Sequence, residues 1–171
     1  WELVAEWQLA DGSDIVVRPI RPEDANLEQA FVEGLSPESR YFRFMQSLDK
    51  LSPIMLARFT QIDYDREMAL IAVVKEHTPD ARFVGVARYV GNPDRHSCEF
   101  ALTVGDDWQR HGVGREMMRR LMEVARDRGI EVMEGEVLAN NSKMLRLCQR
   151  LGFRIARHPS EPDIVQVRRH L

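Results

Sequence analysis

The sequence predicts an α/β domain in which helices flank a mixed sheet of six or seven strands. Three features lead to this prediction. Short apolar runs with strand character are interleaved with amphipathic helical stretches. Residues 115–126 place their apolar side chains at three- and four-residue spacings, as in a helix with one face on a core. A strand, a polar turn with two glycines and this helix follow one another directly.

The composition is that of a globular protein in water. The 171 residues are 44% hydrophobic and 30% charged, and the net charge of −3 argues against a general nucleic-acid binder. No apolar run approaches the roughly 20 residues of a membrane-spanning helix. Cys98 and Cys148 lack metal-ligand spacing, so we expect two buried thiols in a reducing cytoplasm and no bound metal.

The chain begins at Trp1 rather than Met, and we therefore expect it to be a domain cut from a longer polypeptide. Residues 1–10 have no evident place in a core and are interpreted as an N-terminal extension. The remaining residues, 11–171, are enough for one domain with its own core.

The first part of the domain is predicted to contain three helices among its strands. One helix covers 23–34, with Pro22 suited to its first turn. Ser36 and Ser52, each followed by proline, cap the other two. The strands of this part are predicted over 14–19, 68–75, 83–90 and 97–104.

The second part begins with the helix that follows the two glycines. A buried strand is predicted over 131–138, then a helix over 141–151 with Gly152 as its C-cap. Residues 153–157 and 164–168 complete the pattern as a terminal hairpin.

The turn over 109–114 reads Gln-Arg-His-Gly-Val-Gly. The first N–H groups of a helix lack intrahelical partners and lie at the positive end of its dipole. Glycines there let a phosphate approach the bare amides. A P-loop would need Lys and then Ser or Thr where Arg115 and Glu116 stand, and a dinucleotide fingerprint would need a small residue in place of Met117. We interpret the turn as a pyrophosphate site, against the alternative of a helix opened by glycines without a ligand.

This turn matches the (Gln/Arg)-x-x-Gly-x-(Gly/Ala) motif of the GNAT acetyltransferase superfamily, which the chain resembles from about Asp11 to His170. Asn141, Cys148 and the Leu-Gly-Phe run that ends at Phe153 are similar in spacing to the family's N-x6-Y-x3-GF pattern. The segments IVVRPIRPEDA, FTQIDYDREMALIAV and EFALTV are similar to bacterial Pat-type protein lysine acetyltransferases. In those proteins the domain is commonly fused to a regulatory or acyl-CoA-synthetase-like module.

The resemblance implies a GNAT fold with acetyl-CoA as cosubstrate. It implies that the amides of Leu102 and Val104 contact the pantetheine and the thioester carbonyl, while Asn141 and Met144 flank the pantetheine arm. The full set of residues implied on the cofactor side is Leu102, Thr103, Val104, Gln109, Arg110, His111, Gly112, Val113, Gly114, Arg115, Asn141, Met144 and Cys148. The Pat-type segments imply a lysine of a protein as acceptor, with an AMP-forming acyl-CoA synthetase as the expected partner.

Glu99 is the candidate general base. A free lysine has a pKa of about 10.4, so acyl transfer to its neutral amine needs a proton acceptor. Strand alternation puts Glu99 on the face opposite Cys98 and Phe100, and Glu99 is the one carboxylate on its predicted strand. It stands where Pat-like sequences carry their base. The alternatives are a solvated glutamate near a strand end, or His96 as the base.

Cys148 departs from the family pattern, because most members carry a tyrosine there as the acid for the departing thiolate. A thiol with a pKa of about 8.5 can donate a proton, although a buried inert cysteine is the competing interpretation. The acidic run of Asp63, Asp65 and Glu67 either is a solvated loop or draws a cationic acceptor into the cleft. Two further functions stay open: an acyl-CoA-sensing module without turnover, and a small-molecule amine acetyltransferase.

Overall fold

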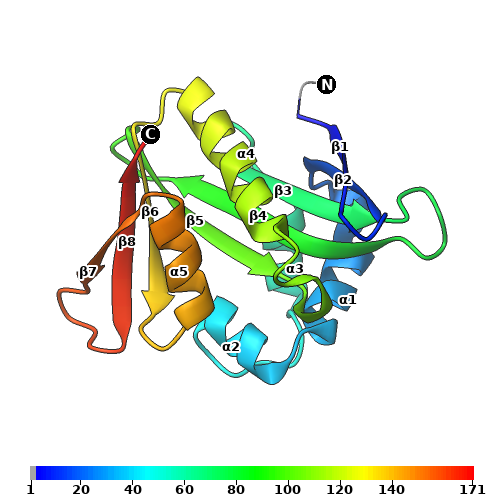
Figure 1. Ribbon diagram of the computed structural model, residues 1–171, viewed down its shortest axis with the longest axis horizontal. Helices are drawn as coiled ribbons and strands as arrows, with labels where there is room; N and C mark the ends of the chain where they lie inside the picture. The colour runs from blue at the N-terminus through cyan, green and yellow to red at the C-terminus, as the bar shows by residue number, and fades with distance from the viewer. Residues whose placement is uncertain (1–2) are drawn as a thin grey trace.

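A single mixed sheet organises the computed structural model, which describes residues 3–171 (Figure 1). In the described residues the sheet has eight strands in the order β1-β2-β3-β4-β5-β6-β8-β7. Neighbours are antiparallel except β5 and β6, which are parallel. The strands are β1 (Ala5–Gln8), β2 (Asp14–Pro19), β3 (Glu67–Val74), β4 (Arg82–Gly91), β5 (Ser97–Val104), β6 (Val132–Leu138), β7 (Arg154–Arg157) and β8 (Ile164–His170).

Five α-helices cover the two faces of the sheet in the described part of the chain. The helices are α1 (Ala25–Gly34), α2 (Pro37–Phe44), α3 (Pro53–Thr60), α4 (Val113–Asp127) and α5 (Ser142–Arg150). Figure 1 shows α4 and α5 on the near side of the sheet, and α1 with α3 behind it. None of the helices described combines the length and the hydropathy needed to cross a membrane.

The predicted α/β architecture is confirmed, with one more strand than expected. The extra strand is β1, which pairs with β2 from Ala5–Val17 to Gln8–Asp14. Leu9 is buried in the core, and its N–H donates to the carbonyl of Ser13 at 2.9 Å. The interpretation that residues 1–10 lie outside the core is therefore wrong for residues 5–9, and residues 1 and 2 lie outside the described part of the chain. Four residues give too short a pattern to identify a strand until its partner is known.

The stripe predicted on the glycine-turn helix packs on the sheet. Met117, Met118 and Leu121 of α4 are buried in one core cluster with Phe100 and Leu102 of β5. A second cluster on the opposite face joins α1 to β3 and β4. Because both faces are covered, all eight residues of β3 are buried, which explains why its sequence is almost continuously apolar.

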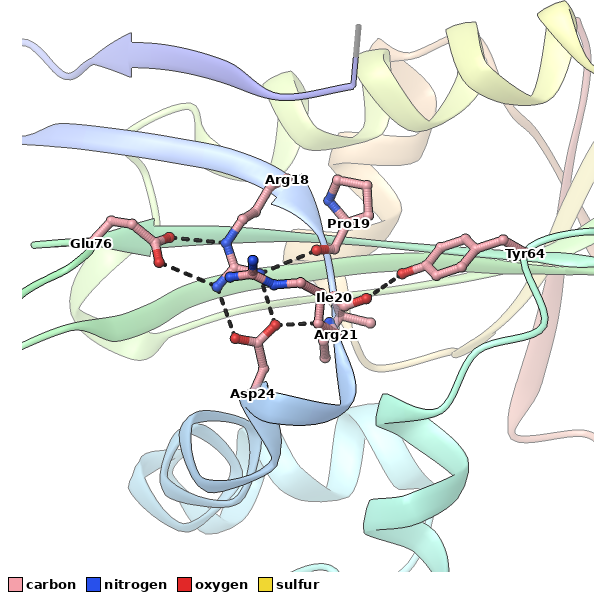
Figure 2. A network of polar contacts seen from close by, with 7 residues as sticks. All are labelled: Arg18, Pro19, Ile20, Arg21, Asp24, Tyr64 and Glu76. Atoms are coloured by element: carbon pink, nitrogen blue, oxygen red, sulfur yellow. Dashed lines mark hydrogen bonds and ion pairs between the residues drawn. The ribbon is translucent and has the colours of Figure 1, made fainter. Parts of the chain in front are cut away.

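A buried ion network holds the approach to α1 (Figure 2). Arg18 of β2 donates to both oxygens of Asp24, at 2.7 and 2.8 Å, and to Glu76 at 3.0 Å. The N–H of Arg21 also donates to Asp24, at 2.8 Å. The Tyr64 hydroxyl donates to the carbonyl of Ile20 in the same turn. This network fixes where the chain leaves the sheet and enters the helical layer.

Candidate active site

The strands β5 and β6 pair for only three residues and then separate. The pairs are Ser97–Val132, Cys98–Met133 and Glu99–Glu134. From there β5 continues along β4 while β6 follows β8 as far as Leu138. Figure 1 shows the arrowheads of β5 and β6 pointing apart. The sheet therefore contains a wedge-shaped gap, with Glu99 at its apex.

Backbone groups of β5 line this gap. Successive residues of a strand direct their N–H and C=O groups to opposite sides. The carbonyl of His96 accepts bonds from the β6 side, whereas the N–H of Gly105 donates to Val84 on the β4 side at 2.8 Å. By this alternation Leu102 and Val104 direct their main-chain groups into the gap.

Thr103 lies differently from its two neighbours. It is paired with Val86 of β4, and its buried side chain lines a small pocket beneath α1 and α2. The main-chain groups of Thr103 therefore point toward β4. The gap is lined by the main-chain groups of its two neighbours, Leu102 and Val104.

The two glycines of the turn have different roles. Gly112 is the N-cap of α4 with a φ of 80°, and a Cβ placed on it would meet no atom within 4 Å. No side chain caps the helix, and the first backbone bond returning to Gly112 comes from Glu116. The amides before Glu116 are therefore available to an anion.

Gly114 is more closely surrounded than Gly112. A Cβ there would lie 3.3 Å from side-chain atoms of Leu102 and Val104 and 3.4 Å from Leu147. The missing side chain lets the first turn of α4 approach β5 and α5 closely. A side chain at Gly114 would press against these three apolar residues, whereas the space around Gly112 is open.

A lysine on α5, which was not predicted from the sequence, contacts the turn. The Lys143 ammonium donates to Oε1 of Gln109 at 3.2 Å, while Nε2 of Gln109 donates to the Val104 carbonyl at 3.2 Å. The turn is thus tied to both sides of the gap and has a cation beside it. Arg110, with a φ of 71°, His111 and Arg115 are exposed on the same turn, whereas Val113 is buried. The sequence signal for Lys143 was its place in the first turn of the helix that begins after Asn141.

The remaining cofactor-side candidates lie on α5. Asn141 is a buried N-cap whose Oδ1 accepts the N–H of Met144 at 3.3 Å, so its side chain starts the helix. Cys148 is buried in the core, and burial raises the pKa of its thiol to about 12. Such a thiol is a weaker acid than an ordinary thiol of pKa about 8.5, so proton transfer from it to a thiolate is unfavourable.

Glu99 is exposed at the apex and has no hydrogen-bond partner among the described residues. Burial of part of the side chain raises its pKa, and the carboxylates of Glu136 and Glu134 raise it further. The alternation predicted for β5 holds, since Cys98 and Phe100 lie in the core on the opposite face. An exposed carboxylate with a raised pKa is suited to accept a proton.

The acidic run before β3 is not a set of free charges. Glu67 is buried and bound to Arg58 at 2.7 Å, so its charge is compensated. Asp63 and Asp65 are exposed, and Oδ1 of Asp63 accepts the N–H of Asp65 in a local turn. His96 is exposed in the β4–β5 turn, with its N–H donating to Asp94. Within residues 3–171 no group of three His, Cys, Asp or Glu side chains is arranged to hold a metal ion.

Comparisons with known proteins agree with this geometry. The family model described as "Acetyltransferase (GNAT) domain" matches residues 14–154. An acetyltransferase of Pseudomonas aeruginosa is 39% identical over 153 residues, which cover 90% of this chain and 82% of the relative. The acetyltransferase Pat of Mycolicibacterium smegmatis is 30% identical over 148 residues, which cover 85% of this chain and 43% of that protein.

Among solved structures, the GNAT domain of Streptomyces lividans PAT is similar over 99% of this chain and 98% of its own, with 30% identity and a TM-score of 0.88. The chain spans less than half the length of the mycobacterial Pat.

Proposed function

The chain belongs to the GNAT acetyltransferase family, and on that premise we propose that it acetylates the ε-amine of a protein lysine with Glu99 as general base. The observation that carries the proposal is the position of Glu99 at the apex of the gap. The gap exposes amides of β5 to an acyl thioester on one side, and the carboxylate stands where an amine would meet that thioester. The proposed base and the proposed oxyanion donor, the N–H of Leu102, therefore lie on the same strand, β5.

The reaction needs a neutral amine, and the raised pKa of Glu99 favours its formation. Glu99 accepts a proton from the lysine ammonium, and the amine nitrogen then bonds to the thioester carbon. The C–S bond breaks, and the sulfur leaves as the thiolate of coenzyme A. The N–H of Leu102, directed into the gap, stabilises the oxyanion of the tetrahedral intermediate. The second amine proton passes to solvent.

The residues present fit acetyl-CoA. The uncapped amino end of α4, the open approach at Gly112 and the ammonium of Lys143 together suit a pyrophosphate. The amides of β5 suit the pantetheine arm, which carries amide groups of its own. Cys148 is assigned to packing, because its raised pKa makes it a poor acid, and the coenzyme A thiolate leaves without a proton from the protein.

The acceptor class rests on similarity and charge. The solved Pat domain is structurally similar over nearly the whole chain, which supports a protein lysine as acceptor. The proposed partner is an AMP-forming acyl-CoA synthetase. Glu134 and Glu136 place two more carboxylates on the strand beside Glu99. A negative field at the apex favours a cationic side chain over a neutral or anionic one.

Glu99→Gln tests the proposal because it keeps the shape and removes the basicity. We expect turnover to fall by roughly 10²–10⁴, the usual contribution of a general base, with acetyl-CoA affinity unchanged by calorimetry. The loss shrinks at high pH, where more of the lysine is already neutral. Glu33→Gln, an exposed glutamate on α1, is the matched control with normal turnover.

The acceptor is tested by mass spectrometry after incubation with acetyl-CoA and a synthetase. We expect one dominant acetylated lysine. Much faster acetylation of free polyamines would replace the protein acceptor with a small amine, and binding without any turnover would indicate a sensor. A Glu99→Gln variant with a normal rate at neutral pH would move the base elsewhere, with His96 the next residue to test.

A further inference from the structure

Three glutamates lie side by side where β5 and β6 separate, and they are held differently. Glu99 and Glu134 are cross-strand partners, so their side chains share a face of the sheet. Glu136 follows two residues later on β6 and therefore lies on the same face. Glu134 is half-buried and Glu136 is exposed.

The two carboxylates of β6 are each held by a hydrogen-bond donor. Asn92, at the end of β4, donates to Oε1 of Glu134 at 3.0 Å and to Oγ of Ser97 at 2.8 Å. His158, between β7 and β8, contacts Oε1 of Glu136 through Nε2 at 3.2 Å. Glu99, by contrast, has no such donor within residues 3–171.

The proton of His158 is placed by its other nitrogen. Nδ1 accepts the N–H groups of Ser160 and Glu161, at 3.2 and 3.0 Å, so it is unprotonated. The neutral ring therefore carries its proton on Nε2 and donates it to Glu136. The Asn92 amide is uncharged, so it holds the Glu134 carboxylate in place without cancelling its charge.

Two of the arginines on this face are paired with other carboxylates. On the β8 side, Arg168 is the cross-strand partner of Glu134, and Arg154 of β7 is the partner of Arg168. On the β4 side, Arg88 lies two residues before Val90, the partner of Glu99. The Arg58–Glu67 ion pair lies beyond β4. Arg88 is paired with Glu28, and Arg58 with Glu67. Arg168 is exposed and makes no hydrogen bond to Glu99 in the described part of the chain.

We infer that Glu134 and Glu136 are positioning residues, held by Asn92 and His158, whose fixed negative charges make Glu99 a stronger base. The inference rests on the proposed role of Glu99. Like charges at short range disfavour ionisation of a carboxyl, so the neighbours shift its titration toward the pH range in which a base works best. Glu99 remains free to rotate toward an amine because it has no fixed partner of its own.

The test is a titration of the Glu99 side-chain carboxyl carbon by NMR, with Glu99→Gln used for assignment. Wild-type Glu99 is expected to titrate above the ordinary glutamate pKa of 4.5. Glu136→Gln and Glu134→Gln should each move the midpoint down, whereas Glu33→Gln should not. His158→Ala, which releases Glu136 but keeps its charge, should move it down by less than Glu136→Gln. Thermal unfolding checks that each variant folds, and all four positions are exposed or half-buried.

Kinetics separate this inference from the assignment of the base. If Glu99 is the base, the acid limb of kcat/KM moves down with the NMR midpoint, and the rate at low pH relative to the plateau rises roughly twofold or more. A merely structural role for Glu134 or Glu136 would change the plateau and leave the limb in place. Unchanged midpoints in both variants overturn the inference. If the NMR titration midpoint of Glu99 moves but the acid limb of kcat/KM does not, the three carboxylates are electrostatically coupled but Glu99 is not the general base.

Discussion

Asp24 and Glu28 lie one helical turn apart at the start of α1, both are buried and both face an arginine, yet their pKa values move in opposite directions. Burial opposes the charge of Asp24, but hydrogen bonds from Arg18 and from the N–H of Arg21 outweigh it and lower the pKa. Burial dominates at Glu28 and raises the pKa, because its nearest cation is weakly placed.

The hydrogen bonds account for the difference. Asp24 receives three of them, at 2.7 to 2.8 Å. Glu28 lies 3.5 Å from Arg88, and its Oε2 has no partner among the described residues. Arg88 also donates to the Phe59 carbonyl and lies over the Phe59 ring. A buried carboxylate is therefore held charged by the bonds it accepts, and proximity to a cation alone does not achieve this.

The same reasoning applies at the candidate active site. Partial burial raises the pKa of Glu99, and the neighbouring carboxylates of Glu136 and Glu134 raise it further. The same functional group thus behaves in three ways. Hydrogen bonds stabilise the charged form of Asp24, burial disfavours the charged form of Glu28, and like charges contribute to disfavouring the charged form of Glu99. Only the last leaves the carboxylate accessible to an acceptor.

The largest effect on stability is expected from Asp24→Asn, which breaks the ion network around Arg18. It removes the charge facing a buried guanidinium, and the free energy of unfolding should fall by about 3 kcal/mol or more at pH 7. The half-buried partner Glu76 provides the comparison, since Glu76→Gln leaves the shorter Asp24 contacts in place and should cost less. Urea unfolding measures both. Equal losses would mean that the two carboxylates share Arg18 evenly.

An intermediate, pH-dependent effect is expected from Glu28→Gln. A group with a raised folded pKa contributes stability that is present below its ordinary value of 4.5 and is lost as pH rises through the folded value. The glutamine amide resembles the protonated acid. The free energy of unfolding of the variant should therefore be within about 1 kcal/mol of the wild-type value at pH 4.5, and it should increase relative to wild type at higher pH.

Asp24 provides the opposite sign in the same experiment. Its stabilisation is present above its ordinary pKa of 3.8 and is lost as pH falls through the lower folded value. Unfolding curves of Asp24→Asn and Glu28→Gln between pH 3 and 8 should therefore diverge from wild type in opposite senses. Parallel curves would show that burial alone sets both charges.

The smallest effect is expected from Arg43→Met. Burial and the charge of Arg88 lower the pKa of Arg43 to about 10, while its attraction lowers the pKa of Glu28. Removing the Arg43 charge ends its repulsion of Arg88 but also ends its attraction to Glu28. Because these two effects oppose each other, the free energy of unfolding should change by about 1 kcal/mol or less at pH 7. The pH window of the Glu28 effect should extend upward. Arg150→Met, an exposed arginine on α5, is the matched control by thermal unfolding.

Local patterns in the sequence determined most of the elements. The spacing of Met117, Met118 and Leu121 predicted the buried face of α4, and the alternation along β5 predicted which side Glu99 faces. Both periodicities belong to one element and need no partner to be recognised. The glycines at 112 and 114 likewise predicted where α4 begins, although they did not show that only Gly112 has open space around it.

Only the tertiary structure decided which residues become neighbours. Strand pairing made β1 part of the sheet, and the Glu99–Glu134 register assembled the carboxylates at the apex. Folding also buried Cys148, brought Lys143 to Gln109 and gave Asp24 and Glu28 opposite charge preferences. These properties depend on distances and solvent exposure between segments far apart in the chain. A sequence states which groups are present, but their pKa values follow from what the fold places around them.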